Sequence, residues 1–328
     1  MKRMTLQLFT FSSILLVTLG SVQNPYTSFY LSELKQPSVM MVSKQVDSLY
    51  DEIKSNVEKY EKSPQNAEVD KVWKATPGYN GLKVDIEASY ENMKKEGMFD
   101  SKKLVYKEVP PSIHLSDLPP EPIYRGHPDK HMVSFIINVA WGNEYIPSML
   151  ETLKKHKVSA TFFLEGRWVK ENPDLAKMIV DAGHEVGNHS YNHPNLKTMT
   201  TSLVREQLVS TNNVIEATTG KKPTWFAPPS GSYRQEVVNI ASELELGTIL
   251  WSVDTIDWQK PTPETLIERV MNKVHPGALI LMHPTDSTAK SLDSLIVRIK
   301  EKNLKLGHVT NLLSEKRVDL PPISQEKQ

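Results

Sequence analysis

The segment 188–194 carries the residue types that are most suggestive of chemistry in this chain. His189 and His193 stand four residues apart, with Ser190 directly after the first and Pro194 directly after the second. Two imidazoles at this spacing can converge on one divalent ion such as zinc, for which neutral histidine is a preferred ligand. An HxxxH pair also occurs without any metal. The pair therefore predicts half of a metal site, and the question is whether the chain supplies the other half.

Further polar residues follow the ends of short apolar runs. These runs lie at 132–140, 159–165, 225–228, 247–253 and 277–283, and helical patterns separate them. Strands that alternate with helices predict a parallel sheet with crossover helices. About seven such units favour a distorted (β/α) barrel, although periodicity alone leaves an open sheet as an alternative. In such barrels the active site lies at the carboxyl ends of the strands. The residues found there are Asn138, His189, His193, 228–231, Asp254, Asp257 and His283.

Together these motifs resemble the NodB-homology polysaccharide deacetylases, carbohydrate esterase family 4, over about residues 131–312. The resemblance implies a barrel of the NodB type that hydrolyses N-acetyl groups of cell-wall amino sugars. It also implies a glycan partner such as peptidoglycan or a chitin-like N-acetylated polysaccharide. The motifs that carry it, in the family's order, are 141–145, 160–163, 189–194, 227–231, 254–258 and 281–283.

The resemblance also assigns roles to individual residues. It makes His189 and His193 ligands of a divalent metal such as zinc, and His283 the general acid. Asp257 would tune His283, and the amide of Ser230 would donate to the oxyanion.

Three aromatic or cyclic side chains complete the implied site. Trp258 would form a wall of the substrate pocket, Trp141 would stack on sugar, and Pro229 would contact substrate. Each also has a plainer interpretation, because tryptophan is common in cores and paired prolines are common in loops.

The first and third motifs depart from the family. Asn138 stands where the catalytic base belongs, and Val139 occupies the position of the third metal ligand, an aspartate. Ala227 replaces the arginine that pairs with the base. An amide cannot take a proton near neutral pH, and loss of a general base costs on the order of 10²–10⁴ in rate. Glu144 is the nearest carboxylate in sequence that could complete a metal site.

Two functions therefore compete. The chain is either a polysaccharide deacetylase with weak activity or a non-catalytic glycan-binding or scaffold pseudoenzyme of the cell envelope. His189, His193, Asp257 and His283 favour the first, and the substitutions favour the second. A third possibility is hydrolysis with an unusual metal arrangement.

The amino-acid composition excludes some classes of protein. Lys and Arg total 39, Asp and Glu total 39, and there is no cysteine among 328 residues. Balanced charge argues against general nucleic-acid binding, and the absence of cysteine excludes disulfides and thiolate metal sites. Residues 1–23 combine a basic start with an uncharged apolar run, which is the pattern of a signal peptide or a membrane anchor. The chain is therefore expected to be exported, to the cell wall or the outer face of the membrane.

The remaining chain divides by composition. Helical periodicity at 39–57 and 85–95, with a short strand at 103–107, predicts a small accessory α/β region. High proline density then predicts an extended linker, because proline excludes helix. The expected divisions are 1–23 signal or anchor, 24–108 accessory region, 109–130 linker, 131–315 deacetylase-like domain and 316–328 polar tail.

Overall fold

The computed structural model describes residues 2–22 and 48–320. Helix α1 (Lys2–Val22) carries exposed apolar side chains such as Phe9 and Leu16. None of the helices in the described ranges is both long and apolar enough to cross a membrane. The choice between signal peptide and anchor stays a prediction, and the first part of the helix expected at 39–57 lies outside the described residues.

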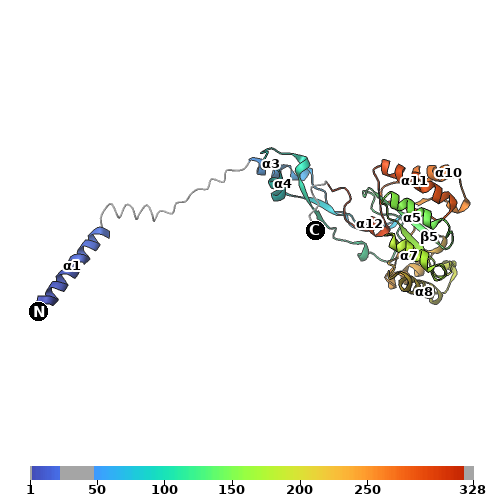
Figure 1. Ribbon diagram of the computed structural model, residues 1–328, viewed down its shortest axis with the longest axis horizontal. Helices are drawn as coiled ribbons and strands as arrows, with labels where there is room; N and C mark the ends of the chain where they lie inside the picture. Colours follow the sequence, from blue (N-terminus) through green and yellow to red (C-terminus); the bar gives the residue numbers. More distant parts are fainter. Residues whose placement is uncertain (1, 23–47, 321–328) are drawn as a thin grey trace.

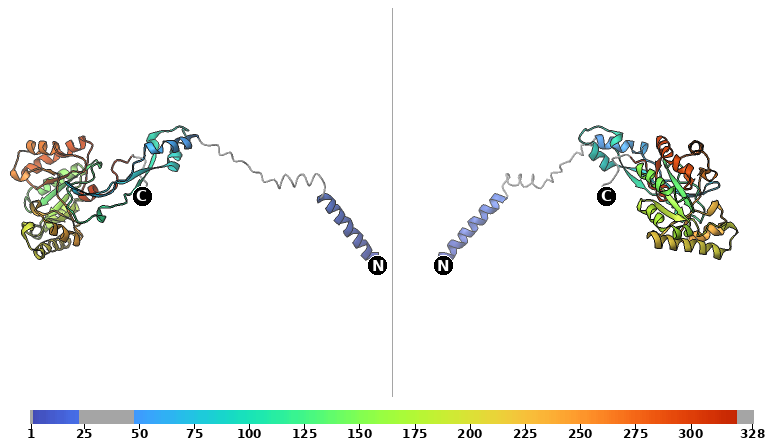
Figure 2. Two further views of the ribbon diagram at one scale, coloured as in Figure 1. Left: turned by 180° about the vertical axis from the view of Figure 1, so that it is seen from behind. Right: turned by 45° about the vertical axis from the view of Figure 1, so that its right-hand side comes forward.

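A small α/β unit precedes the barrel and projects from it in both views of Figure 2. Its two helices pack on a two-stranded antiparallel sheet through a core of their own, in which Leu49, Ile53 and Met93 are buried. The helix predicted at 85–95 is confirmed as 86–93, and Asp85 caps its start, because the Asp85 carboxylate accepts a bond from the Ala88 N–H. The elements are α3 (Ser48–Asn56), β1 (Glu68–Asp70), β2 (Lys74–Thr76), β3 (Gly81–Asp85), α4 (Ile86–Met93) and β4 (Val105–Val109).

The rest of the described chain alternates strand and helix, as the sequence predicts, and forms a curled parallel sheet of the NodB barrel type surrounded by helices (Figure 1). Its strands are β5 (Met132–Val139), β6 (Thr161–Leu164), β7 (Glu185–Asn188), β8 (Trp225–Phe226), β9 (Gly247–Thr248), β10 (Val253–Asp254), β11 (Leu279–Met282) and β12 (Lys305–Leu306).

Seven helices follow their strands in the chain and cover the outside of the sheet. They are α5 (Ile146–Lys155), α6 (Gly166–Glu171), α7 (Pro173–Asp181), α8 (Thr201–Thr219), α9 (Gln235–Glu243), α10 (Pro263–Met271) and α11 (Asp286–Glu301). The short helix α12 (Val309–Leu313) instead packs against the inner face of the sheet, where Val309, Leu312 and Leu313 are buried.

The barrel is incompletely closed. The strand order is β10-β11-β5-β6-β7-β8-β9, and β12 pairs with the start of β5. An open edge strand would present unpaired backbone groups. The proline-rich segment covers this edge, because the Ile123 N–H donates to the Thr248 carbonyl and Leu250 N–H donates to Ile123, both at 2.8 Å. The segment expected as a linker is thus extended and docked along the barrel.

The side chains of strand β5 pack alternately into two cores, one on each face of the sheet. Val133, Phe135, Ile137 and Val139 face the helices in the larger core cluster, whereas Ile136 belongs to a smaller cluster on the inner face. This alternation follows from the two-residue period of a strand. It determines which residues at the end of β5 can reach the barrel mouth.

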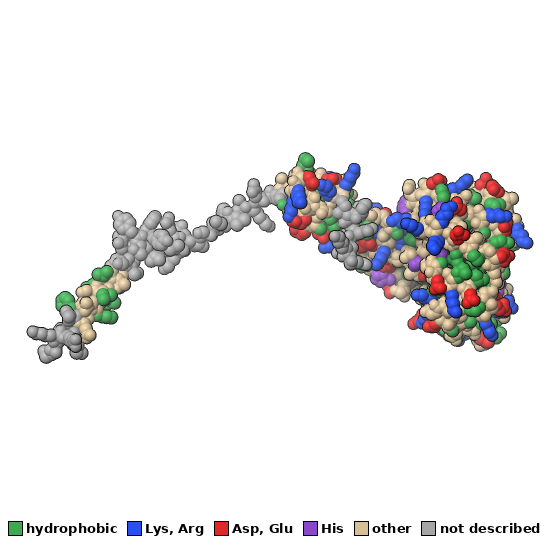
Figure 3. Space-filling view, viewed as in Figure 1, with side chains coloured by type: hydrophobic (Ala, Val, Ile, Leu, Met, Phe, Trp, Pro, Cys, Tyr) green, Lys and Arg blue, Asp and Glu red, His purple; other side chains and the backbone are tan. Residues whose placement is uncertain are grey.

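The segment after α12 returns to the accessory unit. The Arg317 guanidinium lies 4.2 Å from the centre of the Tyr79 ring, donates to the Asn80 carbonyl and makes a two-bond pair with Asp319. Burial and the nearby Asp319 carboxylate raise the pKa of Tyr79 to about 12. The first residues of the expected polar tail therefore connect barrel and accessory unit. On the face shown in Figure 3, charges of both signs are interspersed.

Candidate functional site

Loops at the carboxyl ends of the strands enclose a cavity of about 450 Å³. This volume lies within the range of about 300–1,000 Å³ that is typical of small-molecule sites. Most of the strand-end residues singled out from the sequence meet in it, although they are spread over about 145 positions of the chain. The cavity is lined by Asn138, Ala140, Trp141, His189, His193, Ser230, Trp251, Asp254, Trp258, Leu281 and His283.

His189 is a neutral imidazole, and one of its two ring nitrogens donates a hydrogen bond to the backbone. It is 1% exposed, and its Nδ1 lies 2.8 Å from the Ala227 carbonyl, to which it must donate. The other nitrogen, Nε2, is therefore the unprotonated one. Burial, with His193 nearby, lowers the pKa of His189 to about 3. Desolvation also lowers the pKa of His193, and the two ring centres are 5.1 Å apart. Both imidazoles are neutral at physiological pH, the form in which histidine binds metals or accepts hydrogen bonds.

The loops that carry the site contain strained backbone. Ser190, His193, Ser230, Ile256 and Lys260 all have φ between 52° and 62°, in the left-handed region. Side chains with a Cβ rarely adopt this conformation, and for a β-branched residue such as isoleucine it is an outlier. Such residues cost of order 1–3 kcal/mol each and cluster at functional sites. The strain fixes the direction in which each loop presents its side chains.

Asn138 points from the inner face of β5 into the cavity. It is 5% exposed, and its Oδ1 has no hydrogen-bond partner within the described residues. Ala227, which stands where the family has an arginine, is buried in the inner core cluster and offers no donor. A buried acceptor without a partner costs about 1–3 kcal/mol. The Asn138 side chain thus lines the cavity with a buried, unpaired Oδ1, and its amide cannot act as a base.

Val139 lies on the opposite side of the strand from Asn138. It is fully buried in the larger core cluster and does not line the cavity. Its backbone carbonyl accepts a bond from the Glu165 N–H at the end of the neighbouring strand. The position that the resemblance assigns to the third metal ligand therefore holds an apolar side chain that is packed against the helices.

The residues present do not fit the family's metal site. His189 and His193 provide two ligands, whereas zinc sites in proteins use three or four. Across residues 2–22 and 48–320, no group of three or more His, Cys, Asp or Glu side chains could hold a metal. Glu144, the carboxylate considered from the sequence, lines a neighbouring cavity rather than this one. Asp254 lines the cavity but accepts a bond from the Ile256 N–H.

Asp257 and His283 form a buried pair beside the cavity. The Asp257 carboxylate is 0% exposed and accepts three bonds, from the His283 backbone N–H at 2.6 Å, His283 Nδ1 at 2.8 Å and Thr288 Oγ1 at 2.6 Å. Because Nδ1 donates to the carboxylate, Nε2 of His283 is the nitrogen left for the cavity. The Trp141 ring stacks on the imidazole with an interplanar angle of 8°. The His283 ring is thus oriented with Nε2 towards the cavity, as a general acid or a hydrogen-bonding residue requires.

Two exposed tryptophans separate this cavity from a second one. Trp141 is 47% and Trp258 57% exposed, and both also line an adjoining hollow of about 660 Å³. Exposed indole rings at the mouth of a cavity are suited to stacking on the apolar face of a sugar. Two adjoining hollows that share these rings could receive more than one unit of a polymer.

The structure places the remaining predicted residues as follows. Ser230 lines the cavity, whereas Pro229 is buried and does not. Asp254 and Trp251 line the cavity without having been assigned a role from the sequence. Asp254 is the last residue of β10, and its place at a strand end is the signal that singled it out in the sequence.

The chain forms an open parallel barrel, and an HxxxH loop and an Asp–His pair lie at the carboxyl ends of its strands. This combination of fold and site is that of the NodB-type carbohydrate esterases. A sequence model of the polysaccharide deacetylase family matches residues 125–249. The peptidoglycan-N-acetylmuramic acid deacetylase PdaA of Bacillus subtilis (strain 168) is 32% identical over 205 residues, covering 61% of this chain and 78% of PdaA. The chain belongs to the polysaccharide deacetylase family.

Solved structures point to a particular branch of this family. BA3943 of Bacillus anthracis, a family 4 pseudoenzyme, matches with a TM-score of 0.80 and 63% identity, covering 83% of this chain and 97% of that structure. A BA3943 mutant with restored enzymatic activity matches with a TM-score of 0.79 and 62% identity, covering 82% of this chain and 99% of the mutant structure. The similarity to a pseudoenzyme agrees with the substitutions in the first motif.

Proposed function

We propose that this protein binds an N-acetylated cell-wall glycan at the cavity and does not hydrolyse it by the family's mechanism. The observation that carries the proposal is the end of β5, where Asn138 faces the cavity and Val139 faces the core. The first residue cannot remove a proton from water, and the second cannot ligate a metal. Because the base and the metal act on the same water molecule, the two losses reinforce each other.

What the site retains is suited to recognition. Trp141 and Trp258 present indole faces, and Asn138, His189 and His283 present polar atoms in fixed directions. The polar side chain of Asn138 lines the cavity, with its Oδ1 buried and without a partner among the described residues. The ligand would be peptidoglycan or a related N-acetylated polysaccharide. The apolar start of the chain supports a location outside the cytoplasmic membrane, with the barrel facing the wall.

The intact Asp257–His283 pair favours a second candidate, slow hydrolysis. A positioned acid can still protonate a leaving amine, and residual catalysis by the remaining groups is a general property of damaged active sites. Loss of the base alone predicts a rate lower by about 10²–10⁴. Sensitive measurement of acetate release separates this candidate from pure binding.

The test uses the full chain with chitooligosaccharide and purified peptidoglycan. Bound zinc, glycan affinity and acetate release are measured for the unmodified protein, Asn138→Asp, and Asn138→Asp combined with Val139→Asp. The proposal expects glycan binding, less than one zinc per chain and no acetate from the unmodified protein, with zinc gained only by the double variant. Stoichiometric zinc with turnover in the unmodified protein would establish an enzyme instead. Absence of glycan binding, or binding that Trp258→Ala leaves unchanged, would exclude the proposed site.

A further inference from the structure

The charges that face the candidate site are unbalanced. Asp254 is the one carboxylate among the residues that line the cavity, and none of those residues is a lysine or an arginine. Asp254 is partly exposed at the end of β10, and its Oδ1 accepts a bond from the Ile256 N–H at 2.8 Å, which fixes the side chain. It makes no ion pair with any residue that the structure describes. The cavity therefore carries a negative charge that no side chain around it neutralises.

Two imidazoles add ring nitrogens that a ligand can reach. His193 is exposed, and the centre of its ring lies 5.1 Å from that of His189. The His283 side chain is 19% exposed, and because its Nδ1 donates to Asp257, its Nε2 is an acceptor in the neutral ring. His189 itself is almost completely buried. The accessible acceptors of the cavity are thus supplied by Asp254, His193 and His283.

Three tryptophans form much of the remaining wall. Trp141, Trp251 and Trp258 all line the cavity. The Trp141 ring stacks on His283 with ring centres 5.9 Å apart, and the Trp251 ring packs on Gly231, where a Cβ would lie 2.8 Å from it. The faces of indole rings are electron-rich and attract ammonium groups within about 6 Å. The carboxylate, the ring nitrogens and the indole faces therefore all favour a positively charged ligand.

This surplus of negative charge follows from the loss of the metal site. In the arrangement that the family resemblance implies, a divalent ion and an arginine bring three positive charges, and the base and the third ligand bring two negative ones. Asn138, Val139 and Ala227 remove the three charged side chains, and the described residues do not fit a metal. The balance around Asp254 consequently moves by one unit charge towards negative. A cation that belongs to the ligand would restore it.

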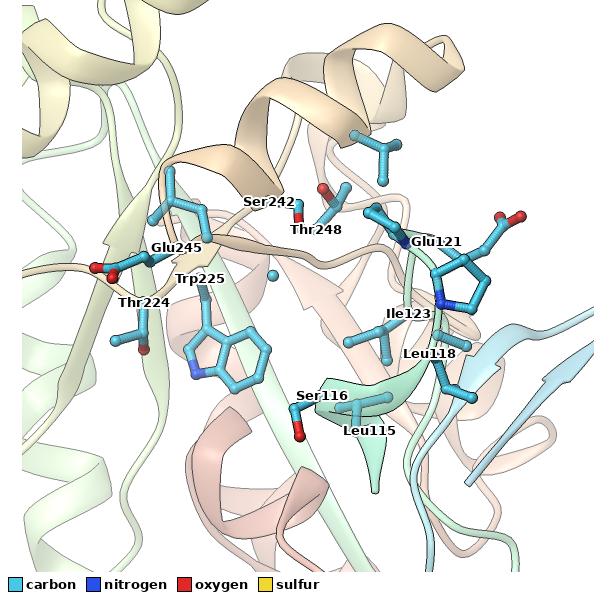
Figure 4. Close-up of a pocket in the computed structure, with 16 residues that line it drawn as sticks. Leu115, Ser116, Leu118, Glu121, Ile123, Thr224, Trp225, Ser242, Glu245 and Thr248 are labelled. Carbon is cyan, nitrogen blue, oxygen red and sulfur yellow. The ribbon is translucent and has the colours of Figure 1, made fainter. Parts of the chain in front are cut away.

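The other cavity of the same volume has a different character. It also measures about 450 Å³, lies between the proline-rich segment and the elements β8, β9 and α9, and has Trp225 in one wall (Figure 4). The Glu245 carboxylate at its edge pairs with Lys222 at 2.6 Å, and Figure 4 shows the Glu121 side chain directed away from the cavity. A tryptophan beside apolar side chains does not define a class of ligand. The candidate site differs because an unpaired charge accompanies its aromatic walls.

We propose that the candidate site selects an amino-sugar unit whose nitrogen is a free ammonium group, within a cell-wall glycan that is otherwise N-acetylated. The inference rests on the proposed function, because it names the unit that the same site recognises. An ammonium group donates three charge-assisted hydrogen bonds and supplies the cation that Asp254 lacks, whereas an acetamide is neutral and donates one. Free amines arise in such a glycan by hydrolysis of its acetamide groups, so an N-deacetylation must supply the ligand. A chain that has lost this reaction would then recognise its product.

The experiment compares two trisaccharides on the full chain by isothermal titration calorimetry. They are tri-N-acetylchitotriose and the fully de-N-acetylated trimer, which places an amine in the cavity in every register. At a mildly acidic pH that keeps the amines protonated, we expect the de-N-acetylated trimer to bind about 10-fold more tightly, which equals about 1.4 kcal/mol. The difference should shrink at high salt, since salt screens a charge contact that is partly exposed.

Asp254→Asn removes the charge and keeps an oxygen for the Ile256 N–H. It should weaken binding of the de-N-acetylated trimer by about 10-fold and change the affinity for tri-N-acetylchitotriose by less than about twofold. Asp100→Asn is the matched control, because Asp100 accepts the Lys102 N–H in the same kind of turn, within the accessory unit. The control changes the net charge equally and should leave both affinities unchanged. Circular dichroism of each variant checks that the fold is retained.

The outcomes separate this inference from the proposed function. A preference for the free amine that is lost in Asp254→Asn and kept in Asp100→Asn supports the inference. Equal affinity for the two trimers, or a preference that Asp254→Asn retains, would overturn it and leave the proposed function standing. Failure of both trimers to bind, or binding that Trp258→Ala leaves unchanged, would overturn the proposed function as well. If Asp254→Asn does not fold, a preference in the unmodified chain that high salt leaves intact overturns the inference.

Discussion

Val139→Asp tests whether the end of β5 decides between binding and catalysis. The substitution removes a fully buried valine, worth about 1.5–3 kcal/mol of burial. It also introduces a carboxyl group among apolar side chains, at a cost of about 1–3 kcal/mol even when protonated. Without metal, we expect the free energy of unfolding to fall by about 3–5 kcal/mol.

Zinc should reverse much of this loss. A carboxylate at this position could join His189 and His193 only if the end of the strand turns towards the cavity, which supplies the third ligand. Zinc then stabilises the folded state by about 2.7 kcal/mol when its concentration is 100 times its dissociation constant. We therefore expect zinc to restore about 2–3 kcal/mol to the variant and little to the unmodified protein.

The assay is urea unfolding followed by circular dichroism, with chelator and with zinc. Val133→Asp is the matched control, because Val133 is equally buried in the same cluster at the far end of β5. It should be destabilised by a similar amount and gain nothing from zinc. Equal recovery in both variants, or no loss in Val139→Asp without metal, would refute the reasoning. If the control does not fold, Val133→Asn and Val139→Asn give the cost of burial without a charge.

Three further outcomes follow from the contacts. Gly142→Ala should lower stability by about 2–3 kcal/mol in urea unfolding and weaken glycan affinity, because a Cβ at φ 83° would lie 2.0 Å from a proline carbonyl oxygen and displace the Trp141 loop. Asp257→Asn should lower stability by about 2–4 kcal/mol and shift the NMR signal of the His283 ring N–H, since the new amide group faces the two N–H donors of His283. Burial lowers the pKa of His184 to about 4, below its unfolded value near 6.5. The unfolded state therefore binds more protons between these values, and stability should fall by up to about 3 kcal/mol from pH 6.5 to 4, but less in His184→Gln.

Much of the site could be predicted because alternation of strands and helices brings all carboxyl strand ends to one edge. Asn138, His189, His193, Ser230 and His283 gather for this reason, although only the two histidines of the HxxxH loop are close in sequence. Most of the helices around the sheet were also predictable from their apolar faces, among them α5, α9, α10 and α11. The motifs then supplied the family.

Other features depend on long-range contacts that no local pattern encodes. Adjacent residues of a strand point to opposite faces, but at a strand end the twist decides where each side chain goes. The family resemblance put Val139 at the metal-ligand position facing the two histidines, and this placement is wrong, because the structure buries Val139 in the larger core cluster. The proline-rich segment reads locally as extended chain, and nothing in its composition reveals that Ile123 pairs with β9. The cavity beside Trp225 consequently escaped the sequence-based prediction.

The backbone strain in the loops provides a test of whether the site still binds a ligand or is only inherited from an active ancestor. Left-handed conformations at Ser190, His193, Ser230, Ile256 and Lys260 together oppose folding by several kcal/mol. The barrel core needs none of these residues in that conformation, because none of the five belongs to the buried clusters. The strain does hold His193, Asp257 and Trp258 in position around the cavity. If these loops served no ligand, glycine at the five positions would relieve strain without a functional cost. Ile256→Gly should therefore raise the intrinsic stability of the turn yet weaken glycan binding by loosening Trp258, and an unchanged affinity would argue that the geometry is inherited rather than used.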